Sequence, residues 1–299
     1  MSWILDYDGV LKLYFPEKDT GQMRSSVFYK LSLKRYVHQL DSGCAIFKSA
    51  LTYLDFKKTI PLCQKQCADL TVSPKLQEYI DSKEIYVERR FRLGGELKNH
   101  DPKLSEQYSQ YKSAVDSTMV RPLREQQMWD SFFMCVMQKS CNFSVPGSGK
   151  TASVLGMYAY LREKSLVNRI LVICPKNAFG SWMDEFSACF GEKLPVRVLS
   201  IHDARYKNTN DRRNALQYES GRCNLILVNY ESVGSLEEIL VELAAEKTLL
   251  VFDEVHKVKR VGGEHSSHAL KLAKAATHIV ALTGTPIPNS YLDVYNLLH

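Results

Sequence analysis

Long hydrophobic runs are absent from this sequence of 299 residues. No apolar stretch approaches the roughly 18–20 residues that a helix needs to cross a bilayer, so we do not expect a membrane-spanning protein. The first eight residues lack a basic flank and place Asp6 and Asp8 where a secretory signal would be apolar, so we do not expect secretion. The eight cysteines are scattered, which favours reduced thiols over a disulfide framework. The expected location is therefore cytoplasmic, or nuclear if the source is eukaryotic.

The sequence also contains no repeat, no low-complexity tract and no strongly basic tail. Its composition, 45% hydrophobic and 24% charged, excludes disorder as the main state. The net charge is +6, and residues 1–120 and the remainder each contribute +3. This mild excess permits a nucleic-acid partner without requiring one. The length predicts two domains.

Residues 1–118 carry mixed signals and are predicted to form an accessory α+β domain of unknown role. Residues 98–118 are polar and are typical of a connector with some helix, so the domain boundary is placed near residue 118. The expected elements before it are a hairpin around Asp8–Gly9, helices over 31–40 and 45–56, and a strand over 84–93.

Residues 119–299 have a different rhythm, in which short β-branched runs alternate with longer helix-like stretches. Such alternation indicates an α/β lobe with a parallel sheet that is covered on both faces. Ligands of these sheets bind at the carboxyl ends of the strands, so the residues after each run are the candidates for function. The runs are 169–174, 196–199, 225–228, 248–252 and 278–282.

The first candidate site is the segment 144–151, Ser-Val-Pro-Gly-Ser-Gly-Lys-Thr. Its glycines allow a tight bend whose N–H groups face phosphate oxygens, and the helix that follows adds its positive end. Lys150 would reach the β- and γ-phosphates of a nucleotide, and Thr151 would bind magnesium. The alternative is a glycine-rich surface turn, because Ser144 stands where the common pattern has glycine. The bend consists of Pro146, Gly147, Ser148 and Gly149.

The second candidate is the apolar run 249–252, which ends in Asp253 and Glu254. In a nucleotide motor the first acid holds magnesium and the second polarises the attacking water. The alternative is a strand that simply ends in solvated acids. The third candidate is the turn after 278–282, where Thr283 and Thr285 could bond the Asp253–Glu254 loop and sense the γ-phosphate, or could belong to an ordinary turn.

Together these segments resemble the first RecA-like lobe of superfamily-two helicases, and among them the Swi/Snf-like DNA translocases. Lys150 with Thr151 matches motif I, residues 253–256 match a DEAH-type motif II, and residues 282–286 match motif III. The resemblance implies ATP and magnesium as cofactors, catalytic roles for Glu254, Lys150 and Asp253, and a coupling role for His256, Thr283 and Thr285.

Further matches cover about 123–299. Residues 123–127 resemble the family's L-R-x-x-Q motif, which implies that Gln127 contacts adenine. Residues 173–175 with Trp182, Glu185 and Phe186 resemble motif Ia, and residues 229–231 and 257–259 resemble later segments of the lobe, the second of them followed by Ser266, Ala269 and Leu270. Departures at Glu125–Gln126, at Val255 and at 146–148 put the subfamily in doubt. The resemblance also implies sequence-independent phosphate contacts to double-stranded DNA from Lys176, Tyr230, Lys257 and Lys259.

The resemblance implies a second RecA-like lobe that completes the site with arginines. We expect it in a continuation of the chain or in a partner chain, so that these 299 residues are the N-terminal part of a motor and hydrolyse ATP weakly alone. By analogy the setting is a bacterial DNA-defence (antiviral) or restriction system. The alternatives are a strand-unwinding RNA or DNA helicase, and a nucleotide-dependent DNA-binding scaffold without hydrolysis. A zinc site from His38, Cys44, Cys63 and Cys67 is a further alternative, with spacing that fits no common zinc pattern.

Overall fold

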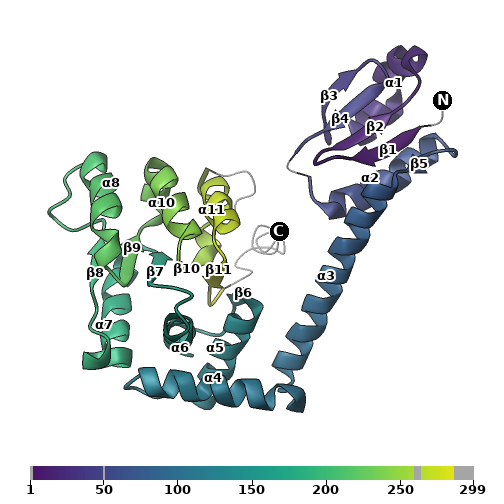
Figure 1. Cartoon of the computed structure of the whole chain (residues 1–299). Coiled ribbons are helices and arrows are strands. Elements are labelled where there is room, and N and C mark those ends of the chain that lie inside the picture. The colour runs from purple at the N-terminus through teal and green to yellow at the C-terminus, as the bar shows by residue number, and fades with distance from the viewer. Residues whose placement is uncertain (1–2, 50, 259–263, 286–299) are drawn as a thin grey trace. The chain divides into compact units, whose positions relative to one another are not determined.

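The structure is a computed structural model that describes residues 3–49, 51–258 and 264–285 (Figure 1). The chain divides into two compact units, Met1–Leu93 and Gly94–His299. Each is described by itself below. In the described part of the chain no helix is long and apolar enough to cross a membrane.

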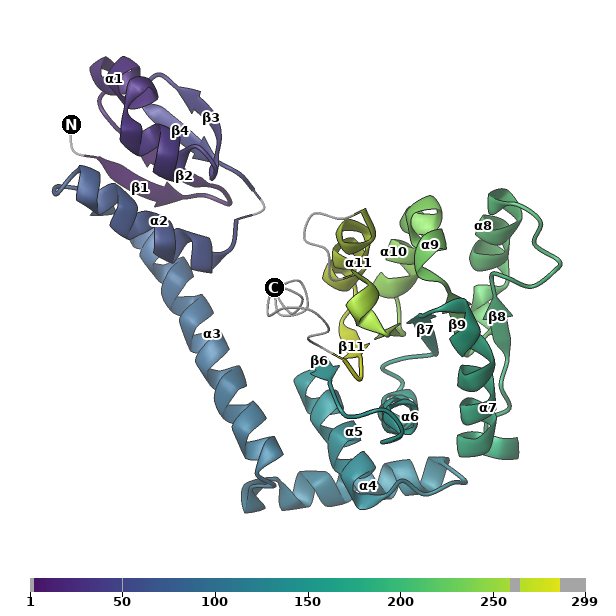
Figure 2. The ribbon, with the colours of Figure 1, turned by 180° about the vertical axis from the view of Figure 1, so that it is seen from behind.

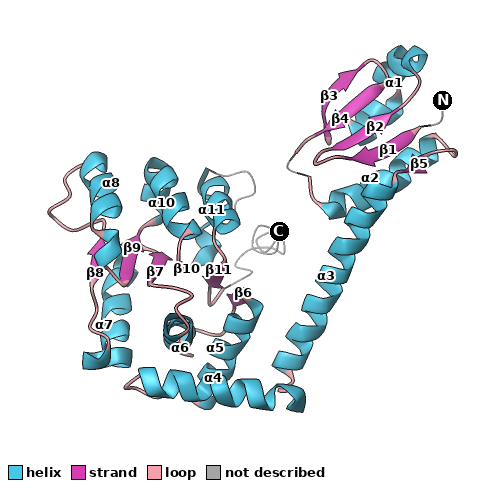
Figure 3. Cartoon of the chain, in the orientation of Figure 1, coloured by secondary structure: helices cyan, strands magenta, loops and turns pink. Residues whose placement is uncertain are grey.

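The N-terminal unit is built on a five-stranded mixed sheet (Figure 3). Its order is β3-β4-β2-β1-β5, and all neighbours are antiparallel except β1 and β5. The hairpin predicted around Asp8–Gly9 is confirmed, and Gly9 has φ +99°, a backbone conformation that favours glycine. The strands are β1 (Ile4–Tyr7), β2 (Leu11–Tyr14), β3 (Val37–Asp41), β4 (Cys44–Phe47) and β5 (Thr71–Val72).

One face of this sheet is apolar and is covered by helices, as Figure 2 shows for α1. Leu11, Leu13 and Phe47 alternate with more exposed residues, as expected of strands with one buried face. The same core takes side chains from the helical segments, for example Met23, Leu33 and Phe56. The covering elements are α1 (Thr20–Ser25), the π-helical turn η2 (Tyr29–Leu33), α2 (Tyr53–Gln66) and the start of α3 (Pro74–Lys98).

Three of the predicted elements in this unit are wrong. The segment 31–40 holds the end of η2 and most of β3, and the segment 45–56 holds most of β4 and only the start of α2. In β4 the buried residues Ala45 and Phe47 follow the strand period of two. The predicted strand 84–93 is part of helix α3. The alternation of Ile85, Val87 and Phe91 was misleading, since these side chains are 44–84% exposed and the intervening residues include helix-favouring Glu and Arg.

The second unit contains a six-stranded sheet of order β6-β11-β10-β7-β9-β8, in which every neighbouring pair is parallel. This confirms the predicted α/β lobe with a parallel sheet. Helices α8, α10 and α11 lie on one side of the sheet, and α5, α6 and α7 lie on the other (Figure 1). The strands are β6 (Lys139–Asn142), β7 (Arg169–Ile173), β8 (Val198–Ser200), β9 (Leu225–Val228), β10 (Thr248–Asp253) and β11 (His278–Leu282).

The helices of this unit include the residues that were expected to form a connector. Helix α4 packs against α6, and the buried Tyr111 hydroxyl lies 2.6 Å from Ser131 Oγ of α5. The compact units therefore divide at Leu93/Gly94 rather than near residue 118; the separate roles of the two domains stay predictions. The helices are α4 (Ser105–Thr118), α5 (Glu125–Met137), α6 (Lys150–Glu163), α7 (Phe179–Phe190), α8 (Thr209–Tyr218), α9 (Tyr230–Val233), α10 (Glu237–Ala245) and α11 (Glu264–Ala275).

Candidate functional site

The carboxyl ends of three neighbouring strands meet at one edge of the parallel sheet. Asn142 of β6 is in register with Leu282 of β11, which is in register with Asp253 of β10. Adjacent strands lie about 4.8 Å apart, so the segments that follow these three residues begin within about 10 Å of one another. The register therefore brings together the three candidate segments: the loop 143–149, Glu254 to His256, and Thr283 to Thr285.

The loop 143–149, hereafter the phosphate loop, joins β6 to helix α6. Gly147 and Gly149 have φ of +80° and +85°, which glycine adopts without strain. Helix α6 begins at Lys150, directly after the loop, so the N–H groups of its first turn point back toward the bend. Ser144 N–H donates to Asn142 Oδ1 at 3.0 Å and fixes the start of the loop. This geometry suits an anion at the helix N-terminus.

Gln127 of α5 supports the far end of the phosphate loop. Its Nε2 donates to the Ser148 carbonyl at 3.0 Å, and its Oε1 accepts from Arg124 N–H at 3.0 Å. A Cβ on Gly149 would lie only 2.1 Å from Gln127 Nε2, so this position leaves no room for a side chain. The structure thus places Gln127 at the loop, and the adenine contact predicted for it stays a prediction.

The Lys150 ammonium lies over the phosphate loop. Its Nζ donates to the carbonyl oxygens of Ser144 at 2.9 Å and of Val145 at 3.3 Å. An ammonium has three N–H donors, so two hold the side chain in place while the third is left for another acceptor. The loop and its lysine are therefore one hydrogen-bonded unit.

Asp253, the last residue of β10, is held from three directions. Trp182 Nε1 of α7 donates to Asp253 Oδ2 at 3.0 Å, and Glu254 N–H donates to Asp253 Oδ1 at 2.9 Å. The Tyr230 hydroxyl donates to the Asp253 carbonyl at 2.7 Å. Each carboxylate oxygen retains acceptor capacity, because it takes part in one of these bonds only. The Trp182 contact was not foreseen: the spacing along the sequence gives no sign that residues 71 positions apart meet.

Tyr230 lies buried beside the end of β10. Its side chain is 3% exposed, and burial raises its pKa well above the ordinary value. The buried hydroxyl donates to the Asp253 carbonyl and so supports the strand end that carries Asp253. The nucleic-acid contact predicted for Tyr230 stays a prediction.

Glu254, His256 and Thr283 form a connected group at the edge. His256 Nδ1 lies 3.1 Å from Glu254 Oε2 and 3.1 Å from Thr283 Oγ1. Thr285 N–H donates to the same Thr283 oxygen at 3.1 Å. The Thr283 hydroxyl can donate to or accept from this nitrogen, according to the tautomer of His256, and a protonated His256 would pair with the Glu254 carboxylate. Glu254 has φ of +53°, a conformation that a residue with a side chain keeps only where its surroundings hold it.

The turn after β11 also packs closely against the phosphate loop. A Cβ on Gly284 would lie 2.9 Å from both Cγ and Cδ of Pro146. Only glycine allows this approach without a shift of the proline ring. A displacement of either segment toward the other would therefore require the other segment to move as well.

The donor set at the edge fits a magnesium ion. A carboxylate and a hydroxyl are oxygen ligands of the kind that magnesium prefers. Asp253 ends a strand and Thr151 lies in the first turn of α6, and Asp253 retains lone pairs on both oxygens. Nowhere in the described ranges, this edge included, are three His, Cys, Asp or Glu side chains grouped so that they could hold a metal ion. Cys63, one of the zinc candidates, is buried, and burial raises its pKa to about 12.

The remaining nucleic-acid candidates are only partly covered by the structure. Lys176 is exposed and lies shortly after the end of β7. The side chain of Lys257 and the whole of Lys259 lie outside the described residues. Their proposed phosphate contacts stay predictions.

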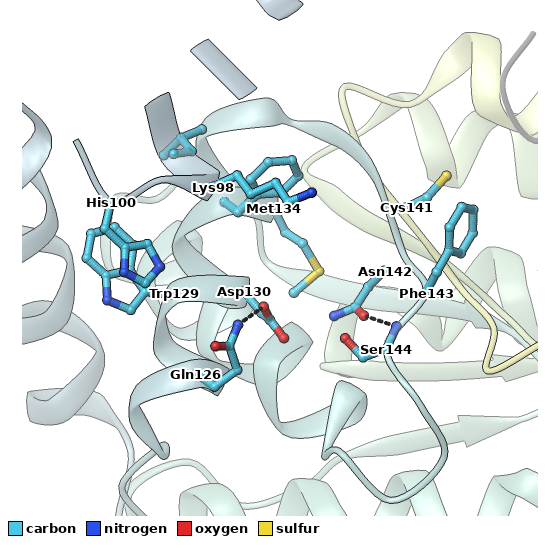
Figure 4. A pocket seen from close by; sticks show the side chains of 12 residues that line it. Lys98, His100, Gln126, Trp129, Asp130, Met134, Cys141, Asn142, Phe143 and Ser144 are labelled. Atoms are coloured by element: carbon cyan, nitrogen blue, oxygen red, sulfur yellow. Dashed lines mark hydrogen bonds between the residues drawn. The ribbon is translucent and has the colours of Figure 1, made fainter. Parts of the chain in front are cut away.

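A pocket of about 490 Å³ lies beside the start of the phosphate loop (Figure 4). Its walls come from the end of α3, from α5, and from β6 with the residues up to Ser144. Trp129 stacks in parallel with His100 and with Tyr108, each at 3.8 Å between ring centroids. The side of α5 that lines the pocket carries Trp129 and its neighbours. Gln127 of the same helix does not line the pocket and is instead bonded to the phosphate loop. Sequence reasoning missed it because the three rings come from separate segments.

Comparison with known proteins identifies the class. The SNF2-related domain family matches residues 143–299, just over half of the chain. The ATP-dependent helicase fft1 of Schizosaccharomyces pombe is 26% identical over 197 residues, which cover 64% of this chain and 20% of that protein. The ATP-dependent helicase FUN30 of Saccharomyces cerevisiae is 24% identical over 153 residues, covering 51% and 13%. The chain thus spans about a fifth or less of these curated relatives.

Among solved structures, the Sulfolobus solfataricus SWI2/SNF2 ATPase core in complex with dsDNA is similar with a TM-score of 0.49 and 24% identity. That match covers 60% of this chain and 36% of the other. The residues that match the family include strands β7 to β11 of the parallel sheet. The chain belongs to the SNF2-related domain family.

Proposed function

We propose that this chain carries the ATP-binding lobe of a motor that translocates along double-stranded DNA. The observation that carries the proposal is the convergence at one sheet edge of the phosphate loop, of Asp253 with Glu254, and of Thr283. The names of the relatives, which are ATP-dependent helicases, support the same activity.

The phosphate loop binds the triphosphate of ATP. The N–H groups at the start of α6 and the free N–H of Lys150 donate to the phosphate oxygens, and the helix end adds a partial positive charge. Magnesium, held by Thr151 and Asp253, would supply positive charge against the phosphates. Trp182 and Tyr230 keep Asp253 in position.

Glu254 accepts a proton from the water that attacks the γ-phosphate. His256 Nδ1 lies 3.1 Å from both a carboxylate oxygen of Glu254 and the hydroxyl of Thr283, so the histidine connects the glutamate to the turn 283–285. A shift of the turn 283–285, which also touches Pro146, would therefore move the base. This connection supports the predicted coupling role of His256, Thr283 and Thr285.

Duplex DNA is the proposed track, bound through its phosphates without regard to base sequence. The exposed Lys176 after β7 supports such a contact, and one similar ATPase core was solved with dsDNA. A second lobe, in a continuation or in a partner chain, would add the arginines that complete the site. A bacterial DNA-defence role stays a proposal by analogy.

Phosphate release tests the proposal. The chain joined to its second lobe is assayed with duplex DNA, single-stranded DNA and RNA in equal amounts. We expect the largest stimulation from duplex DNA, and little hydrolysis by the 299 residues alone. Equal or larger stimulation by RNA would favour the strand-unwinding alternative. ATP binding without turnover in the complete assembly would favour a scaffold.

A further inference from the structure

The positive charge of the N-terminal unit is gathered in one segment. Residues 1–93 contain 15 Lys+Arg and 11 Asp+Glu. Residues 20–49 hold five of these cations and one acid, whereas the rest of the unit holds ten of each. The whole excess of +4 therefore comes from about a third of the unit. A surface that merely solubilises the protein would show both signs interspersed.

The fold brings these five cations to neighbouring elements. We call them the basic face: Arg24 of α1, Lys30 of η2, and Lys34, Arg35 and Lys48 beside it. Lys30 and Lys34 lie about one turn apart, and Lys48 N–H donates to the Tyr36 carbonyl at 2.9 Å, next to Arg35.

The side chains of the basic face are available to a ligand. All five are exposed, and none pairs with a carboxylate in the described part of the chain. Arg24 donates one hydrogen bond, to the Leu40 carbonyl at 3.2 Å, and keeps its other N–H groups. Arg35 lies over the Tyr36 ring at 4.6 Å, which leaves its N–H edge free to donate. The single acid, Asp41, accepts from Gln39 Nε2 at 2.8 Å and 3.0 Å. Elsewhere in the unit, by contrast, Lys12 pairs with Asp8 and Lys57 with Glu84.

We propose that the basic face binds the phosphate backbone of duplex DNA and gives the motor a second grip on its track. The proposal rests on the proposed function, since a DNA motor supplies the polyanion. Lysines and arginines that lie on adjacent elements and have no carboxylate partner among the described residues favour a repeating phosphate ligand over a single anion. Val27 and Leu31, 70% and 78% exposed on the same segment, can contact deoxyribose.

Fluorescence anisotropy with a labelled 30-base-pair duplex tests this. The full chain is titrated at several salt concentrations without nucleotide, as wild type, as K30E/K34E/R35E and as the neutral K30Q/K34Q/R35Q. The control K58E/K65E/K75E makes the same charge change at exposed lysines outside the basic face. Circular dichroism checks that every variant is folded.

Each lost phosphate contact lowers the slope of log K against log salt by about 0.9, so we expect the K30E/K34E/R35E variant to lose about 3 in slope. Its affinity should fall at least tenfold at about 100 mM salt, with a smaller fall for the glutamine variant and little change for the control. Equal losses in the control and the K30E/K34E/R35E variant, or no loss in either, would overturn the proposal.

Two further measurements are made. The first distinguishes DNA binding from membrane binding, and the second separates this inference from the proposed function. Vesicles that contain phosphatidylserine are tested in parallel. If the K30E/K34E/R35E variant loses vesicle binding but keeps the wild-type affinity for DNA, the basic face would be assigned to a membrane surface and the proposal would be overturned. ATP binding is measured in the same samples. If the wild-type chain binds the duplex but not ATP, the proposed function alone fails. If the wild-type chain binds ATP but the K30E/K34E/R35E variant keeps the wild-type affinity for the duplex, this inference alone fails.

Discussion

The two units place their polar residues in different ways. The carboxyl ends of β6, β10 and β11, where the proposed ATP site lies, are called the nucleotide edge below. There Asp253, Glu254, His256 and Thr283 contact one another or residues of distant helices. In the N-terminal unit the core cluster is apolar, and the cations lie on the surface. A catalytic site requires side chains that are held in fixed orientations, which a packed hydrogen-bonded network provides. A surface that binds the DNA phosphate backbone requires only a high density of positive charge. The first kind of site is therefore visible as motifs and the second only as a charge distribution.

Lys150→Ala should have the largest effect on the nucleotide edge. It removes the cation that lies over the phosphate loop, so ATP binding should fall by at least a hundredfold. Isothermal titration with magnesium and ATP measures it. Lys164→Ala, at the other end of α6, is the matched control and should bind normally. Unchanged affinity in Lys150→Ala would mean that the loop does not hold the triphosphate.

Glu254→Gln should separate binding from chemistry. The amide keeps an acceptor for His256 but cannot take a proton, so turnover in the complete motor should fall about 10²- to 10⁴-fold while ATP stays bound. Steady-state phosphate release and ATP titration are compared with Glu192→Gln, an exposed acid elsewhere in the lobe. Near-normal turnover would assign the base to another residue.

The nucleotide edge was largely predictable because its strands are nearly continuous apolar runs. Five runs were predicted and five strands, β7 to β11, were found there. Strand β6 was missed because its sequence, Lys-Ser-Cys-Asn, has no apolar run and it lies at the edge of the sheet. The bond between Trp182 and Asp253 could not be predicted, since it depends on the packing of α7 against the sheet.

In the N-terminal unit the reverse holds. The hairpin was predictable from Asp8–Gly9, because the turn chemistry is local. The assignments of 31–40 and 84–93 failed because short segments can fit either period. Part of 31–40 pairs with β4 as strand β3, whereas 84–93 continues helix α3 with Ile85, Val87 and Phe91 exposed. The charge excess of the basic face could be counted from the sequence, but only the fold shows that its members are neighbours.

Trp182→Phe tests whether support of Asp253 matters, and its effect should be smaller. An aromatic ring smaller than the indole is kept at this buried position, and one hydrogen bond to a charged group is lost, worth about 1.5–3 kcal/mol. We expect ATP affinity in magnesium to fall about tenfold, with little change in EDTA, because the contact acts through the magnesium ligand. Trp129→Phe, in the pocket beside the loop, is the control. Equal losses with and without magnesium would indicate a general packing defect.

Leu13→Ala tests the independence of the two units and should have the smallest effect on the nucleotide. Leu13 is fully buried in the N-terminal core and is in register with Leu5 and Ala45. Its truncation should lower the free energy of unfolding of that unit by about 2–5 kcal/mol. ATP affinity should stay within about twofold, because the residues that form the nucleotide edge all follow Gly94. Thermal unfolding followed by circular dichroism, with ATP titration below the first transition, measures both quantities. Tyr14→Ala, on the same strand but 39% exposed, should change neither much. Loss of ATP binding in Leu13→Ala at a temperature where the lobe is folded would show that the N-terminal unit acts on the nucleotide site, and the contrast between an independent charged surface and a self-contained catalytic edge would fail.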